Sequence, residues 1–289
     1  MKENEEIIVN FTPTGMIPTK DMTPNVPTQP GEIIDQVLKC SELGITMVHL
    51  HARDKNGKPT WRPEPYEEII PAIREENKDL VIGVTCSGRT FQDFEKRSAV
   101  LDLQGEAKPD TASLTLSSLN FNKQASINSP ETIKKLATKM KKKEIKPELE
   151  AFDLGMINYA KYLQRKELIE PPFYFNLILG NVACAQANLL SMGLMKRELP
   201  DNSLFSFGGV GDFQRKVNSI AIVAGAGVRV GLEDNIWFDR QRTKLATNYE
   251  LLSRIKKIAD THDREFMSPS GLRGLLQLKR PEEGYGKES

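Results

Sequence analysis

Short runs of apolar, β-branched and aromatic residues recur along the chain, separated by segments whose apolar positions have helical spacing. Such runs predict buried strands, and apolar residues three or four positions apart predict amphipathic helices. We expect strands at residues 6–11, 47–51, 80–85, 111–116, 146–152, 173–179, 203–208 and 227–232. We expect helices at residues 31–43, 64–76, 129–143, 154–168, 185–197, 214–224 and 241–261. Strand and helix therefore alternate along the chain.

Eight such units without a dividing Pro/Gly/Ser-rich linker favour a closed (β/α)8 barrel of the TIM type over a doubly wound open sheet. The loop after the first strand is rich in proline and lacks the Gly-x-Gly-x-x-Gly turn of dinucleotide-binding sheets. We expect this loop to face a substrate, because the loops after barrel strands form the active face. We assign residues 1–265 to one catalytic domain and residues 266–289 to a C-terminal arm for packing or subunit contacts.

Composition narrows the choice of partner and compartment. The chain has 289 residues with 40 basic and 39 acidic side chains, a net charge of +1, which does not attract nucleic acid or a membrane surface. The expected partner is a small molecule or another copy of the chain. Three cysteines without Cys-x-x-Cys spacing argue against a disulfide scaffold or a zinc ribbon and favour a reducing, cytoplasmic setting. With only three histidines, a metal site has to rely on carboxylates.

Two of those histidines stand in His49-Leu50-His51-Ala52-Arg53-Asp54, at the end of the second predicted strand. Because strand side chains alternate, His49 and His51 point to the same side, toward the barrel interior. Two imidazoles so spaced suit one metal ion, although they also suit a hydrogen-bonded pair of interior histidines. Their position at the rim of a barrel favours the metal.

A carboxylate for this site is offered by the end of the eighth strand, which a closed barrel places one strand away from His49 and His51. Glu233 with the two histidines completes a His₂Glu set that leaves one position open, as in catalytic zinc sites. Asp234 paired with Arg229 is a plausible base. The acidic residues here are also typical of a helix N-cap, and both roles are compatible.

Taken together, the motif His49-x-His51-x-Arg53-Asp54, the block 228–235, the stretch 147–153 and Ser118-Leu119-Asn120-Phe121 resemble the β-keto acid cleavage enzyme family, typified by 3-keto-5-aminohexanoate cleavage enzyme. The resemblance implies a cytoplasmic, homotetrameric, zinc-dependent acyltransferase that converts a β-keto acid and acetyl-CoA to acetoacetate and a new acyl-CoA. It implies His49, His51 and Glu233 as metal ligands and Asp234, held by Arg229, as the catalytic base. The implied substrate-binding residues are Thr85, Ser87, Gly88, Ser118, Asn120 and Glu150, although Glu148 lies on the same strand face as Glu150. The residues that contact CoA are not identified.

Departures from the family pattern bear on the substrate. Ile17 stands where the typifying enzyme has a glutamate suited to an amino group, which favours a non-amino, uncharged or apolar acyl tail. Arg89 is an added cation for a second carboxylate or a CoA phosphate. Cys86 is a less favoured alternative as a nucleophile, because no third histidine neighbours it.

Two other functions remain open at this point. The first is a metal-dependent aldolase or lyase that cleaves a carbon–carbon bond without CoA. The second is a barrel that has lost activity and serves as a binding protein. Both are compatible with the same zinc ligands, so the sequence motif alone does not separate them.

Overall fold

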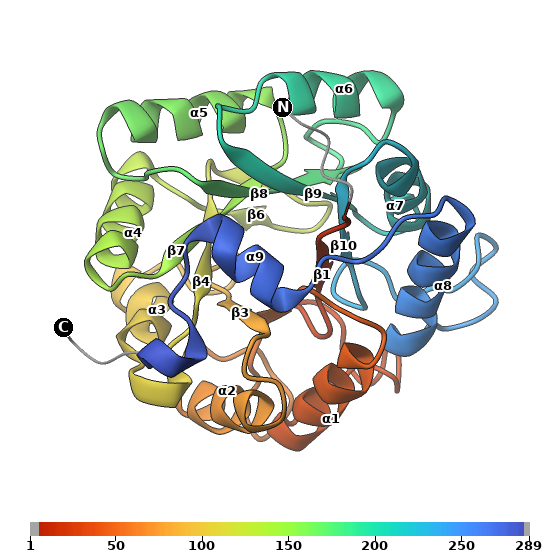
Figure 1. The fold of residues 1–289 in the computed structure, drawn as a ribbon, viewed down its shortest axis with the longest axis horizontal. Helices are drawn as coiled ribbons and strands as arrows, with labels where there is room; N and C mark the ends of the chain where they lie inside the picture. The colour runs from red at the N-terminus through yellow and green to blue at the C-terminus, as the bar shows by residue number, and fades with distance from the viewer. Residues whose placement is uncertain (1–5, 286–289) are drawn as a thin grey trace.

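Eight parallel strands close into a barrel inside a ring of helices (Figure 1), as the alternation of the sequence predicts. The computed structural model describes residues 6–285. Around the barrel the order is β1-β10-β9-β8-β7-β4-β3-β2, so β1 lies between β2 and β10. The strands are β1 (Val9–Phe11), β2 (Met47–Leu50), β3 (Val81–Val84), β4 (Thr111–Thr115), β7 (Lys146–Ala151), β8 (Phe173–Leu179), β9 (Ser203–Gly209) and β10 (Gly227–Val230). The (β/α)8 prediction is confirmed.

Helices follow the strands in turn and cover the outside of the barrel (Figure 1). They are α1 (Pro30–Ser41), α2 (Glu64–Glu76), α3 (Phe94–Ser98), α4 (Pro130–Lys142), α5 (Leu154–Arg165), α6 (Leu189–Arg197), α7 (Phe213–Val223), α8 (Asn248–Thr261) and α9 (Pro269–Leu276). The hydrophobic pattern did not predict α3, because it is only five residues long and continues into a 3-10 helix.

Two predicted helices begin later than expected, and local capping explains both. The helix expected at residues 241–261 starts at Asn248, because the Thr247 hydroxyl accepts the N–H of Glu250 and the Glu250 carboxylate accepts the N–H of Thr247. The helix expected at 185–197 starts at Leu189, where the Asn188 side chain accepts the N–H of Ser191. A short hairpin of β5 (Leu119–Asn120) and β6 (Ala125–Ser126), also not predicted, follows β4.

The helix α9 closes the N-terminal end of the barrel (Figure 1). Its residues Leu272 and Leu276 pack with Ile8, just before β1, and with side chains of β2, β3 and β8. Arg273 donates to both oxygens of Asp110 at 2.8–2.9 Å. The described part of the predicted C-terminal arm is thus packed against its own barrel. Residues 286–289 of that arm, and residues 1–5 of the predicted catalytic domain, lie outside the described residues.

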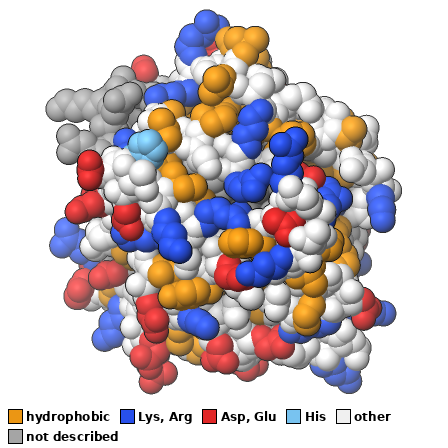
Figure 2. Space-filling view, turned by 90° about the vertical axis from the view of Figure 1, so that its right-hand side faces the viewer, with side chains coloured by type: hydrophobic (Ala, Val, Ile, Leu, Met, Phe, Trp, Pro, Cys, Tyr) orange, Lys and Arg blue, Asp and Glu red, His pale blue; other side chains and the backbone are white. Residues whose placement is uncertain are grey.

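The surface fits the near-neutral composition. On the face in Figure 2, basic and acidic side chains are both scattered among apolar ones. In the described part of the chain, no helix combines the length and the apolar character that crossing a membrane requires.

Candidate active site

Two imidazoles and a carboxylate meet at the C-terminal end of the barrel. His49 lies in β2, His51 directly follows that strand, and Glu233 lies just after β10. The two strands that flank β1 therefore supply all three groups. The Nε2 atoms of His49 and His51 are 3.2 Å apart, and His51 Nε2 is 3.2 Å from Glu233 Oε1. Ligands about 2.0–2.1 Å from a tetrahedral ion stand roughly 3.3 Å apart, so these spacings suit zinc.

Two unpartnered atoms support the same interpretation. Glu233 Oε2 and His51 Nδ1 are buried and have no hydrogen-bond partner among the described residues. A buried carboxylate oxygen without a donor is costly unless a cation or another ligand reaches it. Burial raises the pKa of Glu233, but Arg229 and the two histidines outweigh burial and hold that pKa below its usual range. The carboxylate is therefore ionised and the residues present fit a divalent metal.

Glu148 fixes the orientation of His49. Its Oε2 lies 2.8 Å from His49 Nδ1, while its Oε1 accepts Asn10 Nδ2 at 2.7 Å and also Asn176 Nδ2. The carboxylate is fully buried inside the barrel. An Nδ1–H donated to Glu148 leaves the lone pair of Nε2 directed at the metal position, an arrangement common around histidine ligands. Glu148 thus orients His49 from inside the barrel and does not line the cavity.

Arg229 joins the His49–His51–Glu233 cluster to the candidate base, Asp234. Its Nη2 is 2.7 Å from Glu233 Oε1 and its Nε donates to Asp234 Oδ2 at 2.9 Å. Burial raises the pKa of Asp234 to about 6, against the lowering effect of Arg229 and with a further rise from Glu233. One guanidinium therefore sets the relative positions of the Glu233 and Asp234 carboxylates.

These groups open into a cavity of about 660 Å³. His51, Arg229, Glu233 and Asp234 all line it. Of the two glutamates on β7, Glu150 lines this cavity and Glu148 does not. The Glu150 carboxylate accepts from Thr115 Oγ1 at 2.7 Å, and burial raises its pKa. Both glutamates lie on the same face of β7, as the alternation of strand side chains predicts. Their surroundings differ because Glu148 lies deeper in the barrel, against His49, and Glu150 lies at the cavity.

The other predicted substrate-binding residues divide into two groups. Thr85 and Ser87 line the cavity, whereas Gly88, Ser118 and Asn120 are not among its lining residues. The Ser118 hydroxyl accepts the N–H of Asn128, and the Asn120 carbonyl accepts Asn181 Nδ2. A Cβ at Gly88 would lie 2.3 Å from the carbonyl oxygen of Ile127. These three positions shape the loops around the mouth instead of forming its wall.

Further residues hold the proline-rich loop after β1 against the site. Arg53 Nη2 donates to the carbonyls of Gly15 and Pro18, at 2.5 and 3.0 Å. Gly15 has a φ of +69°, and a Cβ there would lie 2.5 Å from Glu233 Cγ. The loop residues Met16 and Ile17 line the cavity, in agreement with the expected substrate-facing loop. The sequence motif contains Arg53, but the contacts of Arg53 and Gly15 depend on how the loop after β1 folds.

Cys86 does not have the surroundings of a nucleophile. Its side chain is buried and burial raises the pKa of its thiol to about 12. Reactive cysteines have lowered pKa values.

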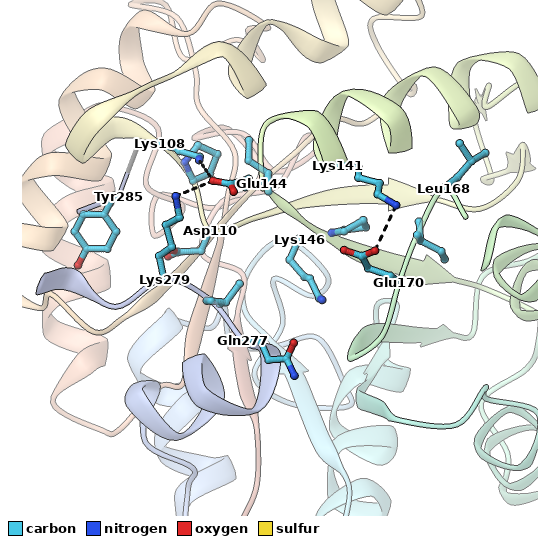
Figure 3. Close-up of a pocket in the computed structure, with 15 residues that line it drawn as sticks. Lys108, Asp110, Lys141, Glu144, Lys146, Leu168, Glu170, Gln277, Lys279 and Tyr285 are labelled. Atoms are coloured by element: carbon cyan, nitrogen blue, oxygen red, sulfur yellow. Dashed lines mark ion pairs between the residues drawn. The ribbon is translucent and has the colours of Figure 1, made fainter. Parts of the chain in front are cut away.

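A second cavity of about 280 Å³ lies at the opposite end of the barrel, between the start of β7 and the segment after α9 (Figure 3). Lysines dominate its polar lining, and Glu144 and Glu170 are paired with them: Glu144 with Lys279 at 2.7 Å and Glu170 with Lys141 at 3.3 Å. Within residues 6–285, the one group of histidine, cysteine and carboxylate side chains close enough together to hold a metal ion is His49, His51 and Glu233, and none of these lines this second cavity.

Comparison with known proteins shows the family and the fold of the chain. A family model described as beta-keto acid cleavage enzyme matches residues 6–278. A 3-keto-5-aminohexanoate cleavage enzyme of Fusobacterium nucleatum is 32% identical, with 96% of this chain and 99% of that protein covered. A 3-oxoadipate:acetyl-CoA acetyltransferase of Cupriavidus necator is 30% identical, with 94% of each covered. The solved apo structure of ObcA has a TM-score of 0.77 at 18% identity, covering 88% of this chain and 66% of that one, and shows a shared fold.

Proposed function

Because the chain belongs to the beta-keto acid cleavage enzyme family, we propose that it is a zinc-dependent transferase that uses acetyl-CoA to cleave a β-keto acid. The products would be acetoacetate and a new acyl-CoA. The observation that carries the proposal is the juxtaposition of the His49–His51–Glu233 cluster with Asp234 in one cavity. The related proteins include transferases whose names specify acetyl-CoA and different β-keto acids.

Different residues of the cavity would bind the metal, accept the proton and contact the substrate. His49, His51 and Glu233 would hold the zinc, which when bound supplies a Lewis acid for the ketone and carboxylate oxygens of the keto acid. Asp234 would take a proton from the carbon between those two groups, because Arg229 engages only its Oδ2 and its Oδ1 accepts no hydrogen bond from a side chain or backbone group within residues 6–285. Glu150, Thr85 and Ser87 would contact the substrate from the cavity wall.

The loop after β1 supports a non-amino acyl tail. Ile17 lines the cavity beside Met16, Pro18 and Met22, all without charge. A substrate ammonium placed against these side chains would lose its hydration without gaining a counter-ion. We expect keto acids without an amino group to have a higher kcat/KM than the 5-amino substrate, and a clear preference for the amino substrate would contradict this assignment.

An assay of acetoacetate formation tests the reaction. Purified protein with zinc, a β-keto acid and acetyl-CoA should form acetoacetate, and omission of acetyl-CoA should stop the loss of keto acid. Loss at the same rate without acetyl-CoA would instead indicate a CoA-independent lyase. No turnover of any keto acid would favour a binding protein.

Metal analysis tests the ligands separately. His49→Ala and Glu233→Gln should each lower the zinc content and abolish activity. His262→Ala is the matched control, because His262 is the third histidine and lies exposed at the end of α8. Full zinc content in both ligand variants would contradict the assignment. A cytoplasmic location and a homotetramer also belong to the proposal, and light scattering of the purified protein tests the assembly.

A further inference from the structure

Arg89 is a cation on the cavity wall whose side chain donates no hydrogen bond to any group in residues 6–285. It lies in the loop after β3, and its guanidinium carbon is 3.8 Å from the centre of the Phe121 ring. The side chain is half-buried, and its Nε is buried without a hydrogen-bond partner among the described residues. This cation–π contact holds the guanidinium against the Phe121 ring and leaves its N–H groups for another group.

Arg97, in the same region, differs from Arg89 because its side chain is hydrogen-bonded within the protein. Arg97 donates to the carbonyls of Cys86 and Ile127 at 2.8 and 3.1 Å, and to Asn128 Oδ1 at 2.6 Å. Those three bonds join the loop after β3 to the end of the β5–β6 hairpin. No side-chain hydrogen bond of Arg89 performs such a task within residues 6–285, so the fold does not explain its position.

The surroundings of Arg89 favour an anion that reaches deep into the cavity. Burial lowers the pKa of Arg89, and the charge of Glu233 opposes that effect, so the guanidinium lies within the electrostatic range of the metal ligands. Uncharged residues, Ile17, Leu119 and Ile178, line the same cavity. A short tail of methylene groups that ends in a carboxylate matches this combination of an apolar wall and a half-buried cation.

We propose that Arg89 binds a second carboxylate at the far end of the acyl tail, so that the preferred substrates are β-keto dicarboxylates. This inference rests on the proposed function and specifies in addition that the acyl tail of the substrate carries a negative charge. A phosphate of CoA is the less suitable anion for Arg89, because a phosphate is strongly hydrated and the buried Nε offers little access to water. The carboxylate next to the ketone is the third alternative, and it is shared by all substrates of the proposed reaction.

Two keto acids of equal chain length separate these alternatives. 3-Oxoadipate and 3-oxohexanoate differ only in whether a carboxylate or a methyl group ends the tail. With the zinc-loaded protein and acetyl-CoA, we expect a higher kcat/KM for 3-oxoadipate. Arg89→Gln should lower kcat/KM for 3-oxoadipate roughly ten- to a hundredfold, the value of one charge-assisted contact, and leave 3-oxohexanoate nearly unchanged. Arg89→Lys should lose less than Arg89→Gln.

Arg165→Gln removes the same charge from an exposed position at the end of α5 and should change neither substrate. An equal loss for both keto acids would overturn the inference in favour of the carboxylate shared by both. A raised KM for acetyl-CoA with both would overturn it in favour of a CoA phosphate. Turnover without any dependence on tail charge overturns the inference alone, whereas no turnover at all refutes the proposed function and this inference with it.

Discussion

Replacing Glu148 by glutamine tests whether a buried carboxylate sets the metal affinity of His49. Glu148 accepts hydrogen bonds on both oxygens, from His49 Nδ1 on one side and from Asn10 and Asn176 on the other. A glutamine side chain has one oxygen, so its NH₂ group must face either the histidine or the two amide donors. Both orientations place a donor where an acceptor is required.

The size of the effect follows from the hydrogen bond that is lost. A hydrogen bond to a charged group contributes about 1.5–3 kcal/mol, which corresponds to roughly a ten- to hundredfold change in an equilibrium constant. Supporting residues of metal ligands typically change affinity by the same factor. We therefore expect Glu148→Gln to weaken zinc binding roughly ten- to a hundredfold.

Competition with a chromophoric chelator measures this affinity directly. Glu150→Gln is the matched control, since Glu150 lies two residues further on the same face of β7 and its hydrogen bond goes to Thr115. We expect Glu150→Gln to keep the zinc affinity of the unmodified protein while lowering activity. A folded Glu148→Gln variant with unchanged zinc affinity would refute the reasoning about His49.

Two further predictions concern the loop and the closed end of the barrel. Gly15→Ala should lose most of its zinc and activity, because the new Cβ would stand 2.5 Å from Glu233 Cγ at a backbone φ of +69°; metal analysis checks this, and full zinc content would contradict it. Asp110→Asn should lower the free energy of unfolding by about 3–5 kcal/mol in urea denaturation, because Asp110 pairs with two buried arginines, one from α2 and one from α9. Asp102→Asn, at a half-exposed surface pair, should cost under about 1 kcal/mol, and equal losses for the two variants would refute the argument.

The barrel could be predicted from sequence because its signals are local. Each barrel strand is a short apolar run that can be recognised from its own residues alone. The predicted bounds of all eight strands agree with the structure within a few residues. Helix starts were less accurate where side-chain caps decide them, as at Thr247 and Asn188. The segment at α3 is too short to show a helical period.

The sequence by itself determined that His49 and His51 share a strand face and that the end of β10 lies one strand away. Alternation along a strand and closure of a barrel are general geometric rules, so they bring His49, His51 and Glu233 together as a candidate metal site without knowledge of the tertiary structure. Only the tertiary structure decided that Glu148 supports His49 while Glu150 lines the cavity, and that the buried Nε of Arg89 has no hydrogen-bond partner among residues 6–285. These facts depend on depth within the barrel and on loops that approach from distant parts of the chain. Periodicity along one strand carries no information about either.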